Sequence, residues 1–140
     1  MKIKNLIMLC LILAVVENTI AQVESYDIFT FTPDPKWKRS DFNDNIQFTL
    51  QQGNYWAIIG LYKSTGTKGD IMSDFQADWN DMIGKNYIVT TDISREENNF
   101  NGWQMMTGNA GGTFQSQNVN ISLLTFSCPA RRSTILITKN

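Results

Sequence analysis

The stretch IQFTLQQGNYWAIIGLY, residues 46–62, decides how the rest of the chain is interpreted. In its first half, apolar residues alternate with polar ones, which is the period of a strand with one buried face. Gly53-Asn54 is a two-residue turn signal, and a second apolar run follows it. The two faces of that run are Trp56, Ile58 and Tyr62 on one side and Tyr55, Ala57, Ile59 and Leu61 on the other. The stretch therefore predicts a β-hairpin whose second strand is covered on both faces.

One segment has the period of a helix instead. Apolar residues recur at helical spacing at Phe75, Trp79, Met82 and Ile83. Ser73 and Gln76 resemble a capping box, and Gly84 stands where a helix would stop, which predicts a helix over residues 73–83. Its acids are expected on a solvated face, which we favour over a metal site: they are Asp74, Asp78 and Asp81.

The remaining chain is typical of short strands joined by polar connectors. Pro33 and Pro35 exclude a regular ladder there. Strand composition marks residues 26–32, 87–91, 103–107, 119–128 and 134–138. Polar or glycine-rich residues mark the connectors 63–69, 92–102, 108–117 and 129–132. The pattern predicts an α+β fold in which a twisted antiparallel β-sheet is flanked by a helix.

The N-terminus has the layout of a secretory signal. Lys2 and Lys4 precede an apolar run over residues 6–16, and Thr19 and Ala21 stand at the positions that a signal peptidase reads. The run is shorter than the roughly 18–20 residues of a membrane span. The sequence therefore predicts a signal peptide over residues 1–21, a single domain over residues 22–140 that is secreted or periplasmic, and no stable membrane span after cleavage.

The two cysteines fit this prediction. Cys10 lies in the apolar core of the signal, so Cys128 is the one thiol of the mature chain and has no internal partner. We expect Cys128 to be buried in a strand as a small hydrophobe. Acylation of Cys10 as a lipoprotein is the less favoured alternative, because the bulky residues Met8 and Leu9 precede it.

Charge and composition exclude several classes of function. The net charge is -1 for the whole chain and about -2 without the signal, with acids and bases interspersed, which disfavours nucleic acid as a partner. The basic groups at residues 36–39 and 131–132 are interpreted as solvated loop charges. The absence of histidine excludes Ser-His-acid and Cys-His catalysis and histidine metal sites.

The other motifs for chemistry are weak. The loop over residues 62–69 lacks the spacing of a phosphate-binding loop, and Asn43-Asp44-Asn45 lacks the distal glutamate of a calcium loop. Glu96-Glu97 lie in a polar stretch where charge is simply solvated. We therefore predict no catalytic residues, no metal and no cofactor.

Four strings carry a resemblance to a known family. They are YDIFTFTPDPKW (26–37), IIGLYKSTGTKGD (58–70), DFQADWNDMI (74–83) and NGWQMMTG (101–108). In this order they resemble a family of uncharacterised exported bacterial proteins whose plan is similar to the PsbP-like α/β/α sandwich. Photosystem extrinsic subunits and a nuclear-import factor that binds a small GTPase use this fold. The resemblance covers residues 25–139 and implies binding of other proteins.

The chain departs from the family pattern in two places. The Pro-x-Gly-Trp turn reads Asp34-Pro35-Lys36-Trp37, without the glycine. Such domains also close with a helix after the last strand, and here the C-terminal helix is missing because the sequence ends at Asn140. A bare sheet face would expose many aliphatic side chains, so we expect either a C-terminal truncation or self-association.

Aromatic residues near loops are the remaining candidates for binding. Trp37, Tyr62 and Trp103 could form a recognition patch, and the alternative is that all three plug the ends of the sandwich. The sequence thus predicts a non-catalytic binding or accessory domain, with another envelope protein as its partner. The alternative is an envelope enzyme that uses carboxylate or tyrosine chemistry, for which a cleft should join two of Asp70, Asp92, Glu96 and Glu97.

Overall fold

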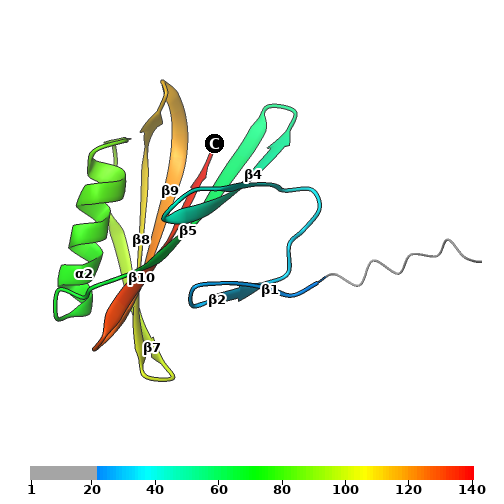
Figure 1. The fold of residues 1–140 in the computed structure, drawn as a ribbon. Helices are drawn as coiled ribbons and strands as arrows, with labels where there is room; N and C mark the ends of the chain where they lie inside the picture. Colours follow the sequence, from blue (N-terminus) through cyan, green and yellow to red (C-terminus); the bar gives the residue numbers. More distant parts are fainter. Residues whose placement is uncertain (1–21) are drawn as a thin grey trace, which may run out of the picture.

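The computed structural model describes residues 22–140, and the predicted signal peptide lies outside the described residues. An eight-stranded sheet forms the body of the molecule (Figure 1), with β7 beside β6 on the far edge of β8 and the other strands in the order β3-β4-β5-β10-β9-β8-β6. The strands are β3 (Lys38–Asp41), β4 (Asn45–Gln52), β5 (Tyr55–Thr65), β6 (Ile88–Val89), β7 (Ser94–Phe100), β8 (Trp103–Phe114), β9 (Gln117–Cys128) and β10 (Arg131–Lys139). Every pairing is antiparallel. With one helix beside the sheet, the predicted α+β class is confirmed.

The hairpin that the alternation predicted is present as β4 and β5, with Phe48 opposite Ile59 and Gln47 opposite Gly60. Gly53 takes a positive φ of 60° in the turn, as a tight hairpin requires. The expectation that β5 is covered on both faces is only half right. Ala57 and Leu61 are buried on one face, while Trp56, Ile58 and Tyr62 on the other are only partly covered.

The predicted single strand over residues 26–32 is wrong. The chain forms two short strands there, β1 (Glu24–Tyr26) and β2 (Phe29–Phe31), which pair with each other in a separate hairpin. Asp27 occupies the turn with a positive φ of 52°, a conformation that aspartate tolerates better than most residues. This hairpin lies against the face of the large sheet opposite the helix (Figure 1).

Two predicted connectors are strands in the structure. Residues 94–100 pair with β8 as the edge strand β7, and β8 continues through the supposed loop at residues 108–117 as far as Phe114. The turns lie elsewhere: Asn101-Gly102 joins β7 to β8, and Gln115-Ser116 joins β8 to β9, all four with positive φ. The glycines of β8 are therefore packing positions within a strand.

The helix begins earlier than predicted and changes from α-helical to π-helical along its length. It comprises α2 (Ile71–Asp78) and the π-helical segment η1 (Trp79–Gly84). Asp70, rather than Ser73, is the N-cap, and its carboxylate accepts a hydrogen bond from the Ser73 amide at 2.9 Å. The helical segment ends at Gly84, one residue beyond the predicted end at Ile83.

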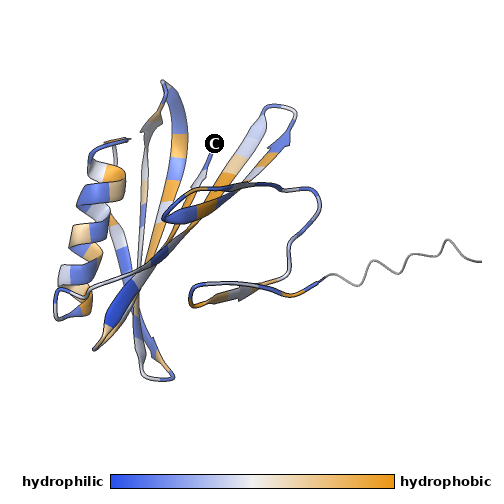
Figure 2. Ribbon diagram, in the orientation of Figure 1, coloured by the Kyte–Doolittle hydropathy of each residue, from blue (hydrophilic) through white to orange (hydrophobic). Residues whose placement is uncertain are grey.

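The core has two parts, one on each face of the sheet. On the helix face, Phe75, Trp79 and Ile83 pack against residues of β8, β9 and β10 that include Met106, Leu123 and Leu136. On the other face, the hairpin β1–β2 and the following loop cover a smaller cluster, in which the rings of Phe31 and Phe48 meet edge to face at 5.3 Å. Figure 2 shows the helix with polar residues on its outer side. The helix contacts mainly β8 and β9, so much of β4 and β5 on this face is left without a covering helix.

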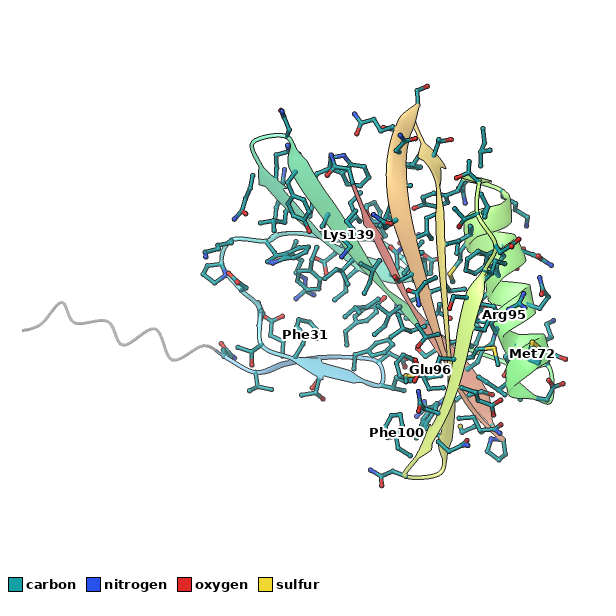
Figure 3. The ribbon with its side chains drawn as sticks, turned by 180° about the vertical axis from the view of Figure 1, so that it is seen from behind. Phe31, Met72, Arg95, Glu96, Phe100 and Lys139 are labelled. Atoms are coloured by element: carbon teal, nitrogen blue, oxygen red, sulfur yellow. The ribbon has the colours of Figure 1, made fainter. Side chains whose placement is uncertain are left out.

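A bare aliphatic sheet face, the premise for predicted self-association, is not found in the described part of the chain. The large apolar side chains that are exposed lie singly on different elements: Val23, Phe42, Tyr55, Met72, Ile88 and Phe100. Figure 3 shows Met72 on the outer side of the helix and Phe100 near the β7–β8 turn. Among residues 22–140 there is also no helix of the length and hydropathy that crossing a membrane requires.

Asp27 ties the N-terminal hairpin to the sheet and makes that contact sensitive to acid. Partial burial disfavours its charged form, but the hydroxyl and amide of Ser64 donate to Oδ2, the amide at 2.6 Å, and the net effect lowers the pKa of Asp27 below its ordinary value of 3.8. A lowered pKa in the folded state stabilises the contact above pH 3.8, and this contribution is lost as the pH falls through the folded-state value.

Asp27→Asn is therefore expected to speed amide hydrogen exchange in β1 and β2 at neutral pH. Asparagine tolerates the same positive φ, so the turn itself should persist. As the pH is lowered from 3.8 toward about 2, exchange in the wild type should approach that of the variant. Equal exchange in both proteins at neutral pH would show that the carboxylate does not hold the hairpin.

Candidate functional site

The sequence predicted that all three acids of the helix lie on a solvated face, and in the structure they do not. Asp81 is exposed and paired with Lys85 at 2.6 Å. Asp74 has no exposed surface and Asp78 is 4 % exposed, because both side chains are turned toward the sheet. The prediction of a solvated face is therefore wrong for these two residues.

The sheet satisfies both buried carboxylates with hydrogen bonds. Asp74 accepts from the hydroxyls of Thr67 and Ser127 and from the amide of Lys68. Asp78 accepts from the hydroxyls of Thr125 and Thr134, at 3.1 and 2.6 Å. The donors come from strands β9 and β10 and from the loop before the helix.

Arg132 supplies the positive charge of this buried network. Its Nε donates to Oδ1 of Asp78 at 2.9 Å, and its Nη1 lies 3.6 Å from Oδ1 of Asp74 and donates to the carbonyl of Gly66. The expectation that Arg131 and Arg132 are both solvated loop charges is thus wrong for Arg132, which is 9 % exposed. Because the network is enclosed and its groups are paired, it holds the helix on the sheet and offers no surface to a ligand.

A concave surface opens beside the helix, where β4 and β5 have no helix over them. It begins as a cavity of about 400 Å³ between the end of the helix and the sheet. Its lining combines aromatic, apolar and polar side chains: Gln47, Ile58, Gly60, Tyr62, Asp81, Met82, Asn86, Tyr87, Phe114, Leu136 and Thr138. The ring of Tyr62 lies over Gly60, where a Cβ atom would come within 2.9 Å of it.

This cavity continues along β5 toward the β4–β5 turn. It shares Ile58 and Phe114 with an adjoining hollow of about 240 Å³, which is also lined by Thr49, Gln51, Trp56, Gln115 and Gln117. That hollow in turn shares Gln51, Trp56 and Gln117 with a more open one at the end of the sheet. We call the first two together the sheet groove, because the face of β4 and β5 forms its floor.

The tyrosines of the sheet groove stay protonated at neutral pH. Burial raises the pKa of Tyr62 above the ordinary phenol value of 10.0, with a smaller opposing effect of a hydrogen bond from Asn45. Burial likewise raises the pKa of Tyr87, whose hydroxyl lies 2.8 Å from that of Thr138. Both phenols can donate and accept hydrogen bonds, and neither is set up as a base or nucleophile.

Trp103 lines a different cavity, on the opposite face of the sheet. This cavity of about 450 Å³ lies beside the β1–β2 hairpin and is also lined by Phe29, Phe100 and Phe126. The guanidinium of Arg131 lies 6.0 Å from the Trp103 ring centroid, the distance of a cation–π contact.

Trp37 lies near the other end of the same hairpin. It packs against the smaller core cluster and lines a shallow apolar cavity with Phe31, Phe48 and Leu61. The three candidate binding residues thus lie in separate cavities, and Tyr62 is on the other face of the sheet from the two tryptophans. They do not form a single patch.

None of the cavities described above is lined by an acid named for the enzyme alternative: Asp70, Asp92, Glu96 or Glu97. Glu96 and Glu97 are neighbours on β7, so their side chains project to opposite faces of the sheet. Figure 3 shows Glu96 on the side of β7 away from the helix, whereas Arg95 faces the helix. The Asp70 carboxylate is engaged as the helix cap, and hydrogen bonds from Ser73 hold its pKa below the ordinary value.

Cys128 ends strand β9 and is partly exposed, so the prediction that it is buried is wrong, although its place in a strand is confirmed. Within residues 22–140, no three acids or cysteines gather closely enough to hold a metal ion.

Sequence reasoning missed most of the sheet groove. Gln47 and Gln51 were visible as the polar half of an alternating strand, which is ordinarily the solvent side. Tyr87 and Phe114 lie in segments predicted as a short strand and a loop. A signal did exist, because the polar face of β4 carries only amides and one hydroxyl, with no charged residue: Asn45, Gln47, Thr49 and Gln51.

No protein-family model matches the chain, and no curated protein matches it either.

Proposed function

We propose that this protein is an exported, non-catalytic binding protein and that the sheet groove holds its ligand. The observation that carries this proposal is the groove itself, a concave surface where Trp56, Tyr62, Tyr87 and Phe114 meet side-chain amides. Binding sites typically combine apolar walls with a few polar groups that fix the orientation of the ligand.

Export is proposed from the N-terminal pattern of basic start, apolar run and small residues before Gln22. The mature domain is then secreted or periplasmic, and another envelope component is the natural source of a ligand. The PsbP-like plan is proposed on the order of the four quoted strings, and a sheet with a helix on one face supports it. The binding role of that fold elsewhere is an analogy.

The competing proposal, an envelope enzyme, has less support. Glu96 and Glu97 point to opposite faces of β7, and the buried acids Asp74 and Asp78 are enclosed by their donors. The raised pKa values of Tyr62 and Tyr87 disfavour phenolate chemistry. A groove of neutral groups suits binding better than proton transfer.

Capture from the envelope fraction tests this proposal. The mature chain from Gln22 onward is immobilised as wild type, as Gln47→Ala/Gln51→Ala in the groove, and as Trp103→Ala on the opposite face. We expect wild type and Trp103→Ala to retain the same component and the groove variant to lose it. Circular dichroism shows whether each variant is folded. Retention by the groove variant, or loss only with folded Trp103→Ala, would place binding elsewhere.

A further inference from the structure

We infer that the ligand of the sheet groove is a neutral oligosaccharide. This inference rests on the proposed function and specifies the ligand class of that site. It follows from the kinds of polar group that line the groove, from their spacing along the strands, and from the near absence of charge.

The floor of the groove is a row of side chains that both donate and accept hydrogen bonds. Gln47, Thr49 and Gln51 occupy alternate positions of β4 and so share one face of the sheet. An amide offers two donors and a carbonyl acceptor, and a hydroxyl offers both functions as well. Such groups match the hydroxyls of a sugar, each of which is also donor and acceptor.

Aromatic rings line the groove beside this row. Tyr87 and Phe114 are stacked with their centroids 4.9 Å apart, and Trp56 packs against Phe114 at 6.4 Å. The indole Nε1 of Trp56 donates to Oε1 of Gln117 at 2.7 Å, which fixes both side chains. Aromatic rings suit the C–H faces of sugar rings, because the aromatic faces are apolar while Tyr and Trp carry a hydrogen-bonding group at the ring edge.

A buried acceptor at the Tyr62 end of the groove lacks a donor. Asn45 stands opposite Tyr62 in the β4–β5 ladder and is 7 % exposed. Its Oδ1 has no hydrogen-bond partner among residues 22–140. Leaving a buried acceptor unpaired is costly, but Asn45 is not among the residues that line the groove, so a ligand at this end would meet Tyr62 rather than this acceptor.

The groove carries little charge. Asp81 is the one ionised side chain among the lining residues of its two cavities, and Lys85 neutralises it from the next turn of the helix. An anionic ligand would find no lining group of opposite sign, and the one carboxylate that a cation could meet is already paired with Lys85. A neutral ligand would leave no buried charge unpaired. From Trp56 to Tyr62 the floor is about 20 Å long, which suits a chain of sugars better than a single ring.

An extended peptide fits this site less well. Peptides that add to a sheet bind along an edge, where backbone groups are free. Here β5 is paired with β4 and β10, and β4 is paired with β5 along its length and with β3 from Ile46 to Thr49. Most of the groove floor therefore offers side chains rather than backbone groups. Hydrogen bonds from side chains without charge pairing favour the hydroxyl-rich ligand.

An array of neutral glycans built from glucose, mannose, galactose and N-acetylglucosamine tests the inference with the mature chain. The tetrasaccharide that binds best is then titrated by calorimetry, and we expect the tryptophan fluorescence to change as Trp56 is covered. Gln47→Ala/Gln51→Ala and Trp56→Ala should each weaken binding by about tenfold or more. Binding should change little with salt, because no ion pair is formed.

Matched controls lie on the same two strands. Tyr55 and Gln52 adjoin Trp56 and Gln51 but project from the opposite face, so Tyr55→Ala and Gln52→Ala should bind as the wild type does. Equal losses in these controls, or no glycan binding, would overturn the inference. If an envelope component is captured through the groove and survives glycosidase but not protease, the ligand is a protein: the inference then fails while the proposed function stands.

Discussion

Asp78→Ala is expected to lower the free energy of unfolding by about 3–5 kcal/mol, because it removes the nearer of the two carboxylates that pair with a buried cation. Arg132 is 9 % exposed and donates from Nε to Asp78. The hydroxyls of Thr125 and Thr134 lose the same acceptor. Urea denaturation followed by circular dichroism measures the change.

Asp81→Ala is the matched control, since it removes an acid from the same helix. Its partner Lys85 is exposed, so the loss of a solvated pair should alter the denaturation midpoint little. Asp78→Leu combined with Arg132→Met should recover only part of the lost stability. Apolar side chains then replace both charges, but Thr125 and Thr134 still lack their acceptor and Asp74 loses its cation. Asp74 keeps its three other donors in that variant. A stability loss for Asp81→Ala as large as for Asp78→Ala would contradict this account of the network.

Gly108→Ala is expected to destabilise the fold by about 1–3 kcal/mol through overpacking. A Cβ atom at Gly108 would lie 2.3 Å from Cζ of Phe75 and 3.1 Å from Cζ3 of Trp79. Phe75 has no exposed surface, so its ring has no room to withdraw. The helix would have to lift away from β8.

A double-mutant cycle identifies the clash. Phe75→Leu alone should be destabilising because it opens a cavity, but Gly108→Ala should cost less in the Phe75→Leu background than in the wild type. Gly66→Ala is the control, because nothing lies within 4 Å of a Cβ atom there. Strictly additive losses for Gly108→Ala and Phe75→Leu would show that the ring is not what excludes the methyl group.

The hairpin β4–β5 could be predicted because its determinants are local. Alternation at Ile46, Phe48 and Leu50 defines one face, and Gly53 permits the turn. Strand β7 could not be found in the same way: its residues SREENNF contain one apolar side chain, and every position is exposed. Main-chain hydrogen bonds to β8 hold β7 in place. The charged side chains of β7 suit an edge strand, because they discourage pairing with a strand of another molecule. The Asn101-Gly102 turn was the available signal.

The buried acids show a different limit of sequence reasoning. Periodicity placed Asp74 and Asp78 away from the apolar residues of the helix, which ordinarily means toward solvent. Their partners Ser127, Thr125 and Thr134 lie 47 to 56 residues further along the chain. In the folded protein the helix presents both carboxylates to these hydroxyls on the sheet. Contacts between residues so far apart in the chain produce no local sequence pattern from which they could be predicted.

The candidate binding residues were predicted in part. Tyr62 lines the sheet groove, but Trp37 and Trp103 lie on the opposite face, beside the β1–β2 hairpin. Aromatic residues near loops gave no indication of face, because the turns that decide it were misplaced in the second half of the chain. The polar stripe on β4 carried more information than the aromatic residues did.

The strand order has a consequence for how the chain folds. Strands β7 to β10 pair as consecutive hairpins, each joined by a short turn, so they can form from local contacts. The pairing of β5 with β10 instead spans a long stretch of chain that includes the helix. Closing so long a loop has an entropic cost that a neighbouring hairpin avoids. We therefore expect β3–β5 and β7–β10 to form first and to join late in folding. At that stage the helix, already packed on β8 and β9, brings Asp78 into contact with Arg132 and Thr134 at the edge of β10 that pairs with β5.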